Sequence, residues 1–467
     1  MRHVSRVSLL LLSASLLASC GGGGPLGVFK KKDKVTVPGE RIAVLVNEAE
    51  IEIDPATASE PMSLPAAVVN EAWAQSGGNA NKSVGHVSLG TALGVAWTAS
   101  IGRGSDKDGR LGGGPVTAEG KVFTMDTAGT VRAFDANSGS QLWSARFGEV
   151  GDNAASIYGG GVAYDGGKVY ATNGLGYVAA LDAGTGAAVW TVRPGGPLRG
   201  EPSVADGAAV WTVKPGGPLR GEPSVAGDAV YVMSQDNQLY SLKTADGSSN
   251  WSNAAALEIA GVFGSAAPAI GQGTVVAGFS SGELNAYRYE NGRMVWQDAL
   301  SRTTMSTSVA SLSDIDADPV IDSGAVYAIG QGGRMVALDL NSGQRVWELN
   351  FGGIATPWLA GDWIFAINDR AQLVAIARRT GKIRWINQLP RYRDQKDRKG
   401  PITYFGPVLA GDRLIIAGTN GALINVEPVS GTFQSQVKIK DGVSFQPVVA
   451  NNTLYLLTDG GSLIAYR

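Results

Sequence analysis

The sequence predicts an all-β fold: an eight-bladed β-propeller of four-stranded antiparallel blades, closed by an N-terminal strand. One segment recurs eight times without gaps, and each copy holds short runs of β-forming residues separated by glycine-containing turns. The eighth copy stops early at Arg467, while an unmatched Trp97 stands before the first copy. The copies start at Val122, Val169, Val230, Val275, Val326, Ile364, Leu414 and Leu454.

Each segment can be divided into strands by its glycines. In VYATNGLGYVAALDAGTGAAVW (169–190), Gly176 suits a tight hairpin turn, and the Gly184-Thr185-Gly186 run makes a second turn. A further short strand precedes most segments, as in ATPWLAGD (355–362). Four short strands in about 45 residues are typical of a propeller blade. We assign the propeller to residues 41–467.

A tryptophan closes most copies of the segment. We expect these indoles to be structural, packed between blades with the ring N–H hydrogen-bonded, because a ligand site does not need the same residue in every blade. Trp97, within LGVAWTASIG (93–102), is expected on the strand that completes the last blade, so that no edge stays open. The set is Trp97, Trp143, Trp190, Trp251, Trp296, Trp347 and Trp385. The run 41–53 is expected to add a further strand nearby.

A tandem duplication interrupts the repeat. Residues 187–207 and 208–228 match at 18 of 21 positions, and each copy amounts to half a blade. A ring cannot absorb half a blade and still close. We therefore expect one copy to be extruded at the junction between the second and third blades.

The first residues look like an export signal, assigned to residues 1–19. Arg2 and Arg6 precede an apolar run that is too short to span a bilayer permanently. The run ends at Leu-Ala-Ser-Cys, which resembles a lipobox and implies cleavage before Cys20 and acylation of that residue. An ordinary secretory signal with a chance cysteine is the alternative. Residues 20–40 are glycine- and lysine-rich and read as a flexible tether.

Composition excludes several classes of function. The formal net charge is -2, so no basic excess exists to bind nucleic acid. The chain has one Cys and two His, so it can form neither an intrachain disulfide nor a cysteine-based zinc site. We expect no metal site and no cofactor. The charged run 391–400 is interpreted as a solvated loop between blades.

The loop LSDIDADP (312–319) is the clearest candidate for a binding site. Asp314, Asp316 and Asp318 are spaced by two, so on an extended chain they share one face. Three interpretations stay open: the aspartates bind a cation, hold a turn, or present negative charge to a partner.

Two resemblances extend this reading. The Ala180-to-Trp190 pattern resembles the PQQ repeat, whose class includes quinoprotein dehydrogenases. The lipobox, the tether, the eight repeats, LSDIDADPV and the segment 389–414 together resemble the BamB family of outer-membrane lipoproteins. That resemblance implies a non-catalytic scaffold on the periplasmic face of the outer membrane, lipid-anchored and bound to the POTRA domains of BamA and to other subunits of the assembly (BAM) complex, without a small-molecule substrate.

The family resemblance also implies contact residues. Leu312, Asp314 and Asp316 match one partner-binding motif of the family, and Phe263 stands where the second motif has arginine. Two other functions remain open, a PQQ-dependent dehydrogenase and a periplasmic glycan-binding propeller. The body of the chain lacks the paired cysteines of the dehydrogenases.

Overall fold

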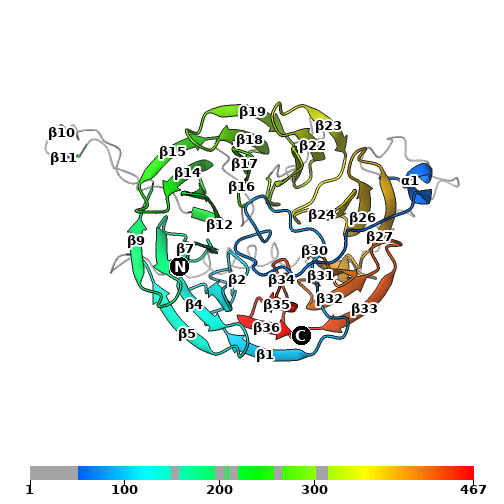
Figure 1. Ribbon diagram of the computed structural model, residues 1–467, viewed down its shortest axis with the longest axis horizontal. Helices are drawn as coiled ribbons and strands as arrows, with labels where there is room; N and C mark the ends of the chain where they lie inside the picture. The colour runs from blue at the N-terminus through cyan, green and yellow to red at the C-terminus, as the bar shows by residue number, and fades with distance from the viewer. Residues whose placement is uncertain are drawn as a thin grey trace, which may run out of the picture. The chain divides into compact units, whose positions relative to one another are not determined.

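The computed structural model describes residues 51–148, 157–194, 204–205, 208–209, 219–256, 266–300 and 314–467. Glu48–Arg467 form one compact unit. In its described part, eight four-stranded antiparallel sheets follow one another around a ring, as Figure 1 shows. The prediction of an all-β, eight-bladed propeller is confirmed.

Seven blades take their four strands consecutively from the chain, with the first strand innermost and the fourth outermost. Blades 1 to 4 comprise β2 (Val116–Ala118), β3 (Lys121–Met125), β4 (Thr130–Asp135), β5 (Gln141–Arg146); β6 (Val162–Asp165), β7 (Lys168–Thr172), β8 (Val178–Asp182), β9 (Ala188–Val192); β12 (Leu219–Ala226), β13 (Ala229–Ser234), β14 (Gln238–Lys243), β15 (Ser249–Ala254); and β16 (Ala269–Gly271), β17 (Thr274–Gly278), β18 (Glu283–Arg288), β19 (Met294–Ala299).

Blades 5 to 7 follow the same order. They comprise β20 (Val320–Asp322), β21 (Ala325–Ile329), β22 (Met335–Asp339), β23 (Arg345–Leu349); β24 (Trp358–Ala360), β25 (Trp363–Ile367), β26 (Gln372–Ala377), β27 (Ile383–Gln388); and β30 (Tyr404–Ala410), β31 (Arg413–Gly418), β32 (Ala422–Val426), β33 (Phe433–Lys438). The charged run 391–400 forms a small, largely exposed hairpin of β28 (Tyr392–Asp394) and β29 (Lys399–Pro401).

Blade 8 joins strands from distant parts of the chain. It comprises β34 (Val448–Ala450), β35 (Thr453–Leu457), β36 (Ser462–Tyr466) and, as its outermost strand, β1 (Val95–Ser100). β1 runs antiparallel to β36, with Trp97 opposite Ala465. The predicted closure by an N-terminal strand is confirmed.

Burial falls from the axis to the rim of the ring. The second strands are almost wholly buried, whereas an outermost strand such as β5 buries little besides Trp143.

The segment before β1 differs from the strand expected over 41–53. Ile53 makes a single parallel bridge to Ile383, and the chain then turns into the short helix α1 (Pro55–Ser59). The Asp54 side chain caps this helix by accepting the Thr57 N–H at 2.8 Å. Residues 41–50 lie outside the described residues.

The duplication falls at the junction of blades 2 and 3, as expected. Each copy contributes one strand to the ring, however, so neither copy is extruded whole. Blade 2 takes its outermost strand β9 from the first copy, and blade 3 takes its innermost strand β12 from the second. Between them, β10 (Val204–Ala205) and β11 (Ala208–Ala209) pair as a separate two-stranded sheet. The surplus is therefore the end of one copy plus the start of the next.

Candidate functional site

The seven tryptophans predicted to be structural lie at the junctions between blades. Each indole N–H donates to a backbone carbonyl of the following blade, over 2.7–3.1 Å. The acceptors, in ring order from Trp97, are Ala136, Ala183, Thr244, Tyr289, Leu340, Arg378 and Pro428.

The accepting carbonyl sits in the turn between the third and fourth strands. In blade 1 the Asp135 side chain accepts the N–H groups of Asn137 and Ser138 at 3.0 and 2.8 Å, which fixes the turn. These hydrogen bonds hold the pKa of the Asp135 carboxyl below its ordinary value. The aspartate of the repeated motif is therefore tied into its own turn.

The acidic loop is partly inside the molecule. Asp314 and Asp318 are both buried, 2% and 5% exposed, and Asp316 and Asp318 line a cavity on the axis of the ring. The structure thus brings Asp316 and Asp318 into one cavity and keeps Asp314 out of its lining. Leu312, Phe263 and Cys20 lie outside the described residues.

Sequence reasoning missed a segment that spans one end of the axis. Residues 68–90, here called the cap, cross the centre of the ring (blue in Figure 1). The cap hydrogen-bonds the innermost strand of every blade in turn as the chain proceeds. The contacts run from Asn70 to β34, Trp73 to β2, Ala74 to β6, Gln75 to β12, Ala80 to β16, Asn81 to β20, Gly85 to β24 and Val87 to β30.

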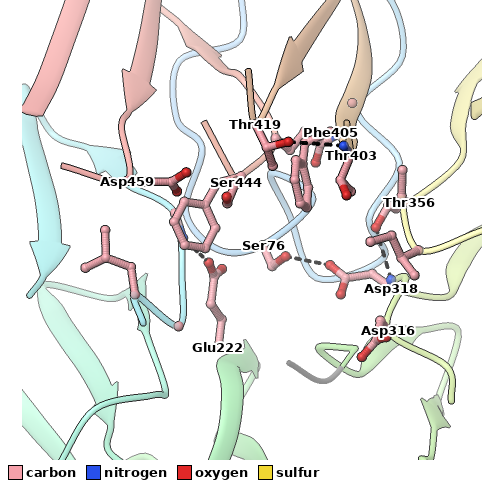
Figure 2. A pocket seen from close by; sticks show the side chains of 18 of the residues that line it. Ser76, Glu222, Asp316, Asp318, Thr356, Thr403, Phe405, Thr419, Ser444 and Asp459 are labelled. Atoms are coloured by element: carbon pink, nitrogen blue, oxygen red, sulfur yellow. Dashed lines mark hydrogen bonds between the residues drawn. The ribbon is translucent and has the colours of Figure 1, made fainter. Parts of the chain in front are cut away.

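The axial cavity lies against this cap. Its volume is about 730 Å³, and Trp73, Ser76 and Gly77 of the cap line it together with residues from most blades. Five carboxylate and two guanidinium side chains belong to the lining: Asp106, Glu222, Asp316, Asp318 and Asp459, and Arg110 and Arg393. Figure 2 shows Ser76, Glu222, Asp316 and Asp318 grouped in this space.

Lys82, Glu222 and Asp318 form a charge cluster at the cap. Lys82 is 2% exposed and donates to Ser224 Oγ at 3.0 Å; burial lowers the pKa of its ammonium group. Asp318 accepts Ser76 Oγ at 2.6 Å and the Ala267 N–H at 2.7 Å. Burial acts in the opposite direction on an acid, and it raises the pKa of the Asp318 carboxyl.

Glu222 is the member of this cluster that comes from β12, the innermost strand of blade 3. Burial first, and the nearby Asp318 carboxylate second, raise the pKa of its carboxyl from 4.5 to about 8. The Gly114 N–H donates to this carboxyl. Lys82 acts in the opposite direction but does not offset the burial.

Glycines make room for the Glu222 side chain. A Cβ built on Gly113 would stand 2.6 Å from Glu222 Cγ, and one on Gly161 would clash with the same atom. Both glycines belong to runs of three glycines in the sequence, Gly112–Gly114 and Gly159–Gly161. The signal that could have revealed the site is the combination of these runs with an acidic residue on an innermost strand.

The described residues contain neither a candidate metal centre nor a candidate membrane-spanning helix. Within the described ranges, no group of three or more His, Cys, Asp or Glu side chains is placed to hold a metal ion. No helix in the same ranges has the length and apolar character needed to cross a bilayer.

Comparison with known sequences gives a consistent result. A family model described as "Outer membrane protein assembly factor BamB" matches residues 94–154, 127–210 and 203–387, which together exceed half of the chain. The assembly factor of this name from Yersinia pestis is 27% identical over 376 residues, spanning 79% of this chain and 88% of that protein.

Comparison with solved structures establishes the fold. The crystal structure of BamB from Moraxella catarrhalis covers 80% of this chain and 100% of its own, with a TM-score of 0.63 and 21% identity. A quinohemoprotein alcohol dehydrogenase from Comamonas testosteroni has a TM-score of 0.61 at 13% identity, covering 86% of this chain and 81% of its own. The propeller is thus shared with proteins of different function.

Proposed function

Because the chain belongs to the BamB family of outer membrane protein assembly factors, we propose that it acts as a non-catalytic scaffold in the outer-membrane assembly complex. The proposal rests on the family match across the repeat region. Relatives of this name, aligned over 79% of the chain, support it. The test is purification of the chain from solubilised outer membranes, where the other subunits of the complex are expected to accompany it.

The proposed partner contact is the POTRA region of BamA, through the loop that contains Leu312 and Asp316. Asp314 is buried, so we assign it the role of holding this loop rather than touching the partner. Replacing Leu312 by Ala is expected to weaken binding to a purified POTRA fragment about tenfold or more, as for an apolar anchor at an interface. Glu290→Ala, on an exposed turn of blade 4, is the matched control and is expected to leave the affinity unchanged. Unchanged affinity in folded L312A removes this loop from the interface.

The proposed location is the periplasmic face of the outer membrane, through acylation of Cys20. Stable anchoring requires more than one lipid chain, which a lipoprotein cysteine provides. Cys20→Ala is expected to abolish membrane attachment and to leave the signal uncleaved by the lipoprotein peptidase. Normal fractionation of C20A with the outer membrane contradicts this assignment.

A quinoprotein dehydrogenase is the second candidate, favoured only by the shared propeller. The chain contains a single Cys, so it cannot form a disulfide between two of its own cysteines, as the dehydrogenases do. Titration of the purified chain with PQQ and calcium distinguishes the two functions, because a scaffold leaves the absorbance of the quinone unchanged. A glycan pull-down tests the remaining alternative, a glycan-binding propeller.

A further inference from the structure

The lining of the axial cavity carries more acidic than basic side chains, five carboxylates against two guanidinium groups. Glu222, Asp316 and Asp318 are among the carboxylates, and Lys82 lies close to two of them, Glu222 and Asp318. Asp318 already accepts two hydrogen bonds, from Ser76 and Ala267. Buried carboxylates of this kind are stabilised by an additional positive charge within a few ångströms.

The position of Glu222 argues for a ligand rather than for stability. A carboxyl group in a poorly hydrated place costs free energy unless a partner offsets it. In the free protein that cost appears as a pKa raised to about 8, although Lys82 is near. The chain nevertheless holds Glu222 there with a cradle of small residues, Gly113 and Gly161.

The walls of the cavity suit an organic cation. The aromatic side chains of Trp73, Phe405 and Phe445 line the same space as the carboxylates. Aromatic faces attract ammonium and guanidinium groups, most strongly where water is excluded. The volume of about 730 Å³ lies in the range of small-molecule sites, roughly 300–1,000 Å³.

We propose that the axial cavity binds an organic cation, whose ammonium or guanidinium group lies between Glu222 and Asp318. Such a ligand is either a free amine or a basic side chain of another protein that enters the cavity. The inference does not depend on binding to BamA, so either can fail without the other.

Binding is expected to be coupled to a proton. Glu222 is faced by Lys82 and Ser76 of the cap and by Asp318 of the blade 5 loop. The other charged groups that line the same cavity are Asp106, Asp316, Asp459, Arg110 and Arg393. A bound cation favours the ionised form of Glu222 and lowers its pKa, so the carboxyl gives up its proton when the ligand enters. Affinity therefore rises with pH up to about 8 and levels off above it.

The experiment is calorimetric titration of the full chain with N-acetylargininamide, whose charge is constant between pH 6 and 9. Affinity is expected to be about tenfold higher at pH 9 than at pH 6, as for one desolvated charge contact. At pH 7, titrations in buffers of different ionisation enthalpy are expected to show proton release. N-acetylcitrullinamide, the neutral analogue, is expected not to bind. Putrescine at pH 7.5 tests a free amine against the side-chain probe.

Variants assign the effect to the cavity. Glu222→Gln is expected to lose both the pH dependence and the proton release, whereas Glu290→Gln on the exposed turn keeps both. Asp316→Asn, a second lining variant, is expected to weaken binding even if E222Q proves unstable. Equal binding of the citrulline analogue, wild-type proton release in E222Q, or no binding of either cation at millimolar concentration overturns the proposal.

Discussion

The indole ring of Trp97 lies directly on Gly139 of the next blade. A Cβ built on Gly139 would stand 2.6 Å from Trp97 Cδ2, and the Trp97 N–H donates to Ala136 in the same turn at 3.1 Å. Glycine and tryptophan thus recur in the repeat because they form the same contact between neighbouring blades. The same contact joins Trp143 to Gly186, Trp190 to Gly247, Trp251 to Gly292, Trp296 to Gly343, Trp347 to Gly381 and Trp385 to Gly431.

Gly139→Ala is expected to destabilise the propeller by about 2–4 kcal/mol, combining a left-handed backbone with overpacking against Trp97. Gly120 in the same blade is a matched control, because its φ of 71° equals that of Gly139 within a degree and nothing lies near its missing Cβ. Gly120→Ala is expected to cost about 1 kcal/mol. Urea unfolding measures both, and equal losses mean that the indole contact contributes nothing.

Gln75 ties the cap to blade 3 and offers a test of the cap. Its side-chain amide donates to the Val225 carbonyl and accepts the Val225 N–H, both at 3.0 Å, and the residue is 4% exposed. Gln75→Ala leaves both backbone groups without partners and is expected to cost about 2–3 kcal/mol. Gln141→Ala, on the exposed side of β5, is expected to change the unfolding free energy by less than about 0.5 kcal/mol. If Q75A loses no more unfolding free energy than Q141A, the cap is not held through Gln75.

Glu222 makes stability depend on pH in a defined direction. Its pKa is about 8 when folded and 4.5 ordinarily, so between these values the folded chain retains a proton that the unfolded chain has lost. The contribution of Glu222 to stability is therefore fully present below pH 4.5 and falls as pH rises to about 8. Glu222→Gln removes this dependence.

The thermal midpoint of E222Q relative to the unsubstituted chain is accordingly expected to rise between pH 5 and pH 9. Lys82 and Asp318 are present in both proteins, so the comparison isolates the substituted carboxyl. Glu290→Gln is expected to show the same difference from the parent at both pH values. A difference for E222Q that does not change with pH contradicts the raised pKa.

The blades could be predicted because their determinants are local and repeated. Hairpin glycines and the Asp135-type turn involve residues close in sequence, and the Trp97-type contact involves the same two repeat positions in consecutive blades. The same contact explains why blade 7 has no tryptophan at this position of the repeat. Blade 7 has Ser435 at the tryptophan position, and blade 8 has no turn between β36 and β1 to receive an indole.

The cap and the charge cluster could not be predicted, because their contacts exist only once the ring has formed. Nothing in residues 68–90 repeats, and its partners lie far along the chain, as for Trp358 and Gly85. Glu222 adds a further ambiguity: the duplication gives the same Leu-Arg-Gly-Glu run at Leu198 and at Leu219. Which glutamate reaches the axis depends on which copy completes blade 3.

Removing 21 residues tests whether the surplus half-blade lies outside the packed ring. Deletion of 198–218 joins Pro197 to Leu219, so β9 and β12 keep their own residues and Arg193 stays over the Tyr177 ring. A shorter connection has less closure entropy to lose on folding, an effect of about 1 kcal/mol at most. The deletion variant is expected to be as stable as the parent chain or slightly more so. Deletion of 187–207 leaves the same sequence except for Lys in place of Arg193, and is expected to behave alike. A loss above about 2 kcal/mol in both variants shows that the surplus residues are built into the core.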